Sequence, residues 1–247
     1  MSTIKSTSIS LSLSNEPTQW DAFKWLQKQL QDRSLEHSKE NQQGVDDLKR
    51  HHAFWAVARL HVQLDFSIIN HHRYDVRTWV NSMGSLGMDR HYEVLDEQER
   101  IVARAVGKWV IVDDERYVLI KPVMLSSLYL NHHETLSRKA IEPMYLDYPS
   151  ISDSPTQTLL RTVIDSEIDF NHHMNNVVYL DYIESLIKLG NRNRPIKDYQ
   201  ITYSQSLFLG DRVRLSLYDY EQTAIVYGVL DQTHKVAFRA ILHFNSR

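Results

Sequence analysis

The order of hydrophobic and polar positions predicts strands along most of the chain and two helices. Residues 6–13 alternate Ser with Ile and Leu, which predicts an antiparallel strand with one solvated face. After Pro17 a helix is predicted to about His37, because apolar residues recur at helical spacing: Trp20, Phe23, Leu26 and Leu30. The polar tract 38–50 contains Gly44 and predicts a loop or a broken helix.

Further strands are predicted in two groups, one in each half of the chain. In the first half these segments are rich in aromatic and branched residues, and they cover residues 54–64, 75–80, 89–95 and 101–112. Residues 121–157 show less pattern, are interrupted by prolines, and allow a short helix between 123 and 136. In the second half the predicted strands are 158–164, 199–209, 212–218, 223–230 and 235–244.

The second helix, residues 177–189, is predicted to be buried over most of its surface. It contains no proline, and Gly190 stands where a helix ends. Its polar residues form one narrow stripe at helical period: Asp181, Glu184, Ser185 and Lys188. The Glu184–Lys188 spacing favours an ion pair and suits a solvated stripe. The remaining apolar surface has to be covered by other parts of the fold.

The elements repeat in the order strand, helix and long antiparallel strands. Residues 75–79 of the first half correspond to residues 211–215 of the second. One mostly buried helix in each copy indicates a curled antiparallel sheet wrapped around a helix. We therefore predict a fold of the α+β class with two such halves, residues 1–125 and 156–247, joined by a linker at 126–155.

The composition argues against several classes of protein. The 247 residues are 42% hydrophobic and 24% charged with a net charge of −3, whereas nucleic-acid-binding domains normally concentrate basic residues. No apolar run approaches the length of a membrane span. Residues 1–15 lack the continuous apolar stretch of a secretory signal. Together with the absence of cysteine, this leads us to expect a cytoplasmic protein.

The residue types also limit the chemistry. Without cysteine there is no disulfide, no thiolate metal ligand and no cysteine nucleophile. None of the seven glycines forms a phosphate-binding loop or a Gly-x-Ser-x-Gly turn. Many of the thirteen histidines stand in adjacent pairs: His51-His52, His71-His72, His132-His133 and His172-His173. Adjacent side chains point in different directions, so we expect no structural metal and no cofactor.

Residues 165–176, directly before the second helix, carry the most distinctive chemistry. Asp169, Asn171 and His173 occupy alternate positions, which can bring a carboxylate, an amide and an imidazole together at the positive end of that helix. Helix capping by Asp and Asn explains only one or two of them. Free N–H groups there can also stabilise an oxyanion. Residues 15–18, before the first helix, contain no such set, so we expect one active site per chain.

The sequence resembles the acyl-acyl-carrier-protein (acyl-ACP) thioesterases, which are double-hotdog enzymes of bacteria and plastids. The resemblance rests on the tandem layout and on an Asp-x-Asn-x-His-x-Asn-Asn-x-x-Tyr motif, here Asp169, Asn171, His173, Asn175, Asn176 and Tyr179. Supporting matches in the first half are Thr78-Trp79, Arg90 and the run from Ala105 to Asp113. The resemblance implies a tandem (double) hotdog of the bacterial type that releases free fatty acid from acyl-ACP by water attack.

One position departs from the family pattern. The family usually carries a Glu in a Tyr-x-x-Glu-x-x-x-Gly-Asp setting, and Ser206 takes its place in Tyr203–Asp211. Alternation along the predicted strand 201–209 puts Ser206 on the face toward the catalytic turn. We therefore count Ser206 with the catalytic residues, holding the attacking water while Asp169 or His173 takes the proton. The alternative is a small polar residue in a space vacated by Glu.

Two alternatives to the leading function stay open. The first is an acyl-CoA thioesterase of the same superfamily, because composition does not separate the two carriers. The second is a hotdog protein that binds acyl groups without hydrolysis, which the serine at position 206 motivates. A homodimer is a candidate assembly, and the sequence leaves the oligomeric state open.

Two further groups of residues have competing interpretations. The resemblance implies that the first half helps to form the acyl pocket, which four large side chains could line, although each is more often plain core: Trp55, Trp79, Met83 and Met88. A basic run follows the second helix: Lys188, Arg192, Arg194 and Lys197. It could dock an acidic carrier protein, but a solvated helix end is the favoured interpretation, because cations stabilise helix C-termini.

Overall fold

Two compact units make up the chain in the computed structural model, which describes residues 4–10, 17–65, 73–128, 135–142, 148, 154–190 and 194–245. Unit 1 comprises Met1–Glu16 and Trp25–Pro143, and unit 2 comprises Pro17–Lys24 and Met144–Arg247. None of the described helices is long and apolar enough to cross a membrane.

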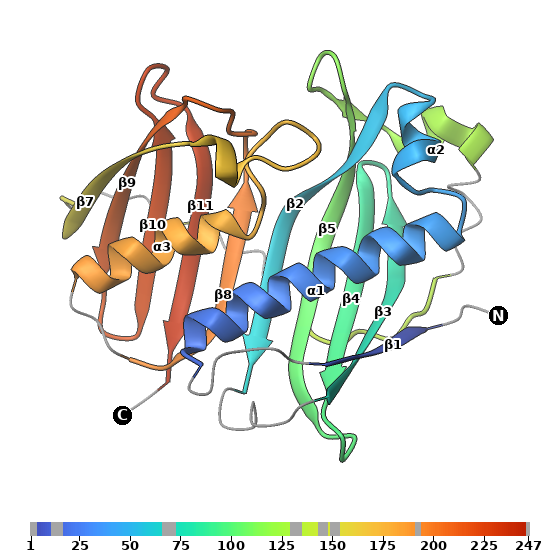
Figure 1. Cartoon of the computed structure of the whole chain (residues 1–247), viewed down its shortest axis with the longest axis horizontal. Helices are drawn as coiled ribbons and strands as arrows, with labels where there is room; N and C mark the ends of the chain where they lie inside the picture. Colours follow the sequence, from blue (N-terminus) through green and yellow to red (C-terminus); the bar gives the residue numbers. More distant parts are fainter. Residues whose placement is uncertain are drawn as a thin grey trace. The chain divides into compact units, whose positions relative to one another are not determined.

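Unit 1 is an antiparallel sheet in the order β1-β3-β4-β5-β2, and helix α1 lies across it (Figure 1). The short strand β6 pairs with β5. The elements are β1 Lys5–Ser10, α1 Gln19–Glu40, α2 Val45–Lys49, β2 Ala53–Leu64, β3 Arg73–Gly84, β4 Gly87–Leu95, β5 Ile101–Asp113, β6 Leu119–Ile120 and the 3₁₀ segment η2 Pro122–Leu128.

Unit 2 repeats this plan with an antiparallel sheet in the order β8-β11-β10-β9-β7, and helix α3 lies against it (Figure 1). The elements are β7 Gln157–Thr162, the 3₁₀ turn η4 Asp165–Glu167, α3 Val178–Leu189, β8 Ile196–Tyr203, β9 Arg212–Asp219, β10 Thr223–Leu230 and β11 Val236–Phe244. A sheet with one largely buried helix, present twice, confirms the predicted tandem hotdog.

The predicted strand 199–209 is wrong at its end. Strand β8 stops at Tyr203, six residues early. The N–H groups of Ser204 and Gln205 both donate to the carbonyl of Ala237, at 2.8 and 3.1 Å. Two successive residues opposite one partner interrupt the ladder as a bulge does. The strict alternation expected for residues 204–209 is therefore lost.

The polar stripe of α3 is less solvated than its pattern predicts. Lys24, in the part of α1 that belongs to unit 2, forms ion pairs with Asp181 at 2.8 Å and Glu184 at 2.7 Å. Glu184 also pairs with Lys188 at 2.5 Å. The Glu184 side chain is only 12% exposed. The expectation of a solvated stripe is thus wrong at Glu184, because a cation from a distant segment covers it.

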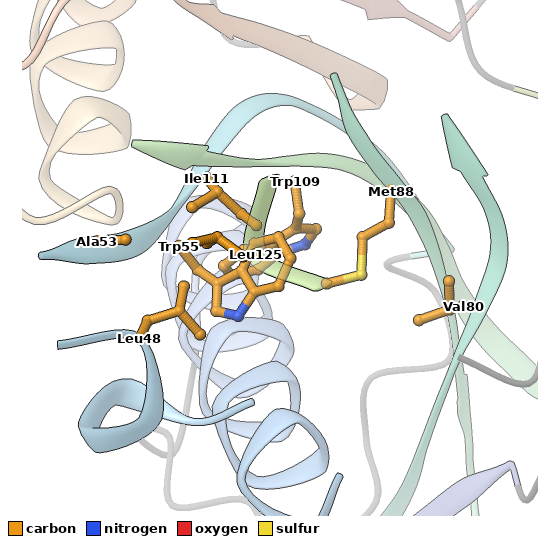
Figure 2. Close-up of a cluster of buried hydrophobic side chains, with 8 residues drawn as sticks. All are labelled: Leu48, Ala53, Trp55, Val80, Met88, Trp109, Ile111 and Leu125. Atoms are coloured by element: carbon orange, nitrogen blue, oxygen red, sulfur yellow. The ribbon is translucent and has the colours of Figure 1, made fainter. Parts of the chain in front are cut away.

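One hydrophobic cluster in the core of unit 1 contains two of the four candidate pocket residues, Trp55 and Met88. Figure 2 shows side chains converging from α2, the surrounding strands and η2: Leu48, Ala53, Trp55, Val80, Met88, Trp109, Ile111 and Leu125. Met83 packs against this cluster, and Trp79 is not part of it. Trp79 instead stacks on His91 at 6.0 Å and donates its indole N–H to the carbonyl of Arg138 at 2.7 Å. A pocket lined by all four residues together is therefore disfavoured.

Residues 135–142 form hydrogen bonds with two residues of β4, His91 and Glu93. The N–H of Ala140 donates to His91 Nδ1 at 3.2 Å, and Arg138 bonds Glu93 at 2.7 Å. Burial lowers the pKa of His91 to about 4. The charges of Asp89 and Glu142 act in the opposite direction, and that of Lys139 acts in the same direction. The imidazole is therefore neutral at neutral pH, as an acceptor for Ala140 requires.

We expect the stability of unit 1 to fall between about pH 6.5 and pH 4 because of His91. In this window the unfolded chain binds a proton at His91 that the folded chain excludes, and below about pH 4 both forms are protonated. His91→Gln keeps an acceptor for Ala140 but does not titrate. Its free energy of unfolding should therefore fall less than that of the wild type between pH 7 and pH 4. Urea unfolding of both proteins measures this difference, and equal losses would contradict a buried neutral His91.

Candidate active site

The segment between η4 and α3 folds into a tight turn that brings its alternate residues together. Ile168 and Met174 form an antiparallel bridge, and the N–H of Asp169 donates to the carbonyl of His173 at 2.9 Å. His172 adopts a left-handed backbone with φ of 64°, which histidine tolerates better than branched residues. The turn therefore sets Asp169 and His173 opposite one another.

Asp169 and His173 form a largely buried pair. His173 Nδ1 lies 3.7 Å from Asp169 Oδ1, and the side chains are 15% and 8% exposed. Burial lowers the pKa of His173, while the charge of Asp169 acts in the opposite direction. Asp169 Oδ1 also accepts the N–H of Asn171 at 2.8 Å. At neutral pH the site thus contains a neutral imidazole beside a fixed carboxylate.

Asn171 contributes an amide that no other described side chain holds. Its backbone N–H donates to Asp169, and its half-buried side chain makes no hydrogen bond to the described residues. The amide N–H₂ is a donor and the amide oxygen an acceptor. Asn171 can therefore bind a substrate carbonyl or a water beside the Asp169–His173 pair.

Asn175 takes up N–H groups at the start of α3. Its side-chain oxygen accepts the N–H of Val177 at 2.9 Å, and its carbonyl accepts that of Val178 at 3.0 Å. These two donors are therefore engaged, and the expected role of helix N–H groups toward an oxyanion is wrong for them. Asn175 thus stabilises the turn that leads into α3, whose N-cap residue is Val177.

Tyr179, the last residue of the motif, belongs to the core of unit 2. It is 2% exposed and packs edge-on against Tyr203 and Phe238, with ring centroids 4.9 and 5.0 Å away. Burial raises the pKa of its phenol, so the hydroxyl stays protonated. These contacts favour a packing role in which Tyr179 holds α3 against β8 and β11.

Ser206 lies next to the turn of residues 168–174, although not for the predicted reason. The carbonyl of the following residue, Leu207, accepts the N–H of Met174 at 2.7 Å. A backbone hydrogen bond, rather than strand alternation, thus brings this segment to the turn. Ser206 is half-buried, and its hydroxyl makes no hydrogen bond to the described residues.

Ser206→Ala separates the two interpretations of the departure from the family pattern. If the hydroxyl holds the attacking water, the rate should fall about fivefold or more, as expected for loss of a hydrogen bond of about 1 kcal/mol. Initial rates measure the effect, and Ser204→Ala, at an exposed position two residues earlier, is the matched control. An unchanged rate in Ser206→Ala, together with a faster Ser206→Glu, would point to a weakened enzyme lacking its usual carboxylate.

Glu167 is a residue that reasoning from the sequence missed. It lies two positions before Asp169, and its side chain is 12% exposed. Its carboxylate accepts hydrogen bonds from the hydroxyl of Tyr182 at 2.9 Å and from the N–H of Ile164 at 3.0 Å. A single carboxylate at this spacing matches no recognised motif, so the sequence offered no signal for it.

Two further groups of polar residues lie outside this turn: a cluster of potential metal ligands and the basic run after α3. Among the described residues, three potential metal ligands come within 4.8 Å of one another, namely His52, Asp114 and Glu115 of unit 1, and His52 and Glu115 are exposed. In the basic run Lys188 pairs with Glu184, and Arg194 bonds carbonyls of unit 2 and lies over Phe244, 5.5 Å from its ring centroid. These contacts favour the structural interpretation of the run. Residues 15, 16 and 192 lie outside the described residues.

Two family models match the two halves of the chain. Residues 22–122 match the model of the acyl-ACP thioesterase N-terminal domain, and residues 153–244 match that of the C-terminal domain. The oleoyl-acyl carrier protein thioesterase of Coriandrum sativum is 22% identical over 164 residues, which are 57% of this chain and 40% of that protein. The matched region is thus less than half the length of this relative.

Solved structures share the fold at low sequence identity. A 12:0-ACP thioesterase from Umbellularia californica superposes with a TM-score of 0.82 at 15% identity, covering 99% of this chain and 98% of the other. An acyl-ACP thioesterase from Bacteroides thetaiotaomicron gives a TM-score of 0.71 at 20% identity, covering 98% of both chains. At identities this low, the structural similarity shows the fold alone. The two domain matches, one on each half of the chain, show the family. The chain belongs to the acyl-ACP thioesterase family.

Proposed function

We propose that the protein hydrolyses the thioester of acyl-ACP and releases a free fatty acid. The observation that carries this proposal is the largely buried Asp169–His173 pair, 3.7 Å apart, beside the side-chain amide of Asn171, which no described residue holds by a hydrogen bond. A thioester hydrolase needs a base for water and a donor for the carbonyl oxygen, and these residues supply both.

Water is the nucleophile in the proposed reaction. Asp169 or His173 takes the proton as the water oxygen bonds to the carbonyl carbon, and Asn171 donates to the developing oxyanion. The tetrahedral intermediate collapses, the carbon–sulfur bond breaks, and the thiolate leaves as a stable anion that needs little protonation. The lowered pKa of His173 keeps the imidazole neutral and able to accept the proton.

One assay of thiol release tests both the proposed hydrolysis and the choice between ACP and CoA as the carrier. We expect purified protein to release free thiol from acyl-ACP, and faster than from acyl-CoA with the same acyl chain. A clear preference for CoA would make it an acyl-CoA thioesterase instead. No thiol release from either carrier, with acyl groups still bound, would identify a non-hydrolytic acyl-binding hotdog. A panel of acyl lengths then defines the chain specificity.

The cellular setting is part of the proposal. We place the enzyme in the cytoplasm, where acyl-ACP supplied by fatty acid biosynthesis would reach it and where a chain without cysteine loses nothing. A homodimer stays the candidate assembly, and sedimentation of the purified protein tests it.

A further inference from the structure

We propose that Glu167 is a positioning residue that holds the catalytic turn in its reactive geometry through Tyr182 and Arg161. This inference rests on the proposed function, because it concerns the alignment of Asp169 and His173. Glu167 itself makes no hydrogen bond or ion pair to either of them among the described residues, so it acts through the backbone.

The carboxylate of Glu167 joins three separate parts of unit 2. One oxygen accepts the hydroxyl of Tyr182 in α3 and the N–H of Ile164 before η4. The other lies 3.7 Å from the guanidinium of Arg161 in β7. Arg161 also lies over the ring of Tyr182, 4.9 Å from its centroid. A carboxylate that accepts two hydrogen bonds and has a guanidinium beside it is a rigid anchor.

The backbone of Glu167 transmits this anchoring to both ends of the turn. Its carbonyl accepts the N–H of Asn175 at 2.9 Å, and the next residue, Ile168, bridges Met174. Asp169 follows directly. Glu167 therefore fixes the strand-like base from which the turn projects, and a shift there would move Asp169 relative to His173.

The protonation state of Tyr182 suits an anchor and not a proton relay. Burial, and then the hydrogen bond to Glu167, raise the pKa of the Tyr182 phenol, so Tyr182 stays a donor. Among the described residues neither Tyr182 nor Arg161 makes a hydrogen bond or an ion pair to Asp169 or His173, which leaves positioning as the role.

Tyr182→Phe and Glu167→Gln test the proposal. Misplacement of a reacting group by about 1 Å can cost ~10²-fold in rate, so we expect kcat to fall about 10–100-fold in Tyr182→Phe while KM stays unchanged. Glu167→Gln should lose less, because an amide oxygen still accepts the Tyr182 hydroxyl. In both variants a loosened turn admits water, so the pKa of His173 should rise toward its ordinary value of 6.5, as measured by NMR.

Tyr148→Phe is the matched control, because it removes a tyrosine hydrogen bond in unit 2, to Thr202 at 3.1 Å, away from the turn. It should leave kcat and the pKa of His173 unchanged. Unaltered kcat and an unaltered His173 pKa in folded Tyr182→Phe would overturn the proposal, as would equal changes in Tyr148→Phe. If wild-type protein released no thiol, the proposed function would fail, and the His173 titration would still decide whether Glu167 positions the turn.

Discussion

Asp169→Asn is expected to lower kcat by about 10²–10⁴-fold, the usual contribution of a general base. The substitution keeps the shape of the side chain and an oxygen that can accept the N–H of Asn171, as Asp169 Oδ1 does at 2.8 Å. The turn should therefore keep its fold, and only the charge and the basicity are lost. Initial rates of thiol release from acyl-ACP, with thermal unfolding measured alongside, test this expectation.

Asp165→Asn provides the matched control for this substitution. Asp165 lies four residues earlier in the exposed η4 turn, so the same chemical change there should leave the rate close to that of the wild type. A folded Asp169→Asn protein with near-normal activity would reduce Asp169 to a local acceptor for the N–H of Asn171. The proton would then have to pass to His173.

The elements that local pattern determines were predictable from the sequence. Helix α3 was expected from a helical period ending at Gly190, and it ends there. The juxtaposition of Asp169 and His173 was expected from their alternate spacing, and the hairpin-like turn realises it with its own backbone hydrogen bonds. In both cases the forces that shape the segment act between residues close in the chain.

The features that were missed depend on partners distant in the chain. Strand β8 ends at Tyr203 because Ser204 and Gln205 share the carbonyl of Ala237 on another strand. Glu184 is covered because Lys24, in a different helix, reaches it. No window of local sequence contains these partners, so no periodicity could reveal them.

The surroundings of Trp79 also depend on a distant segment of the chain. The resemblance made Trp79 a candidate for the acyl pocket, with plain core as the more frequent alternative. In the structure its buried indole stacks on His91 and donates to the carbonyl of Arg138. Which face of a strand becomes covered depends on where a later segment crosses it. Residues 135–142 have little pattern of their own and gave no indication of that path.

His173→Asn should reduce kcat by about 10²-fold or more, whereas His172→Asn should leave it near the wild-type value. The two histidines are adjacent, but the turn directs only His173 toward Asp169, and the His172 side chain is exposed. Asn is the substitution of choice because it tolerates the left-handed backbone at position 172, where φ is 64°. Rates measured over a range of pH in both variants separate their contributions.

The pH dependence adds a second, independent readout for the same pair of variants. Burial lowers the pKa of His173, so the wild-type rate should fall with decreasing pH only below the ordinary histidine value of 6.5. The charge of His172 also lowers the pKa of His173. Removing that charge should therefore move the midpoint of the acid limb in His172→Asn to a higher pH. An acid limb at the same pH in the wild type and in a still active His173→Asn protein would show that another group titrates, and Asp169 would then act without the imidazole.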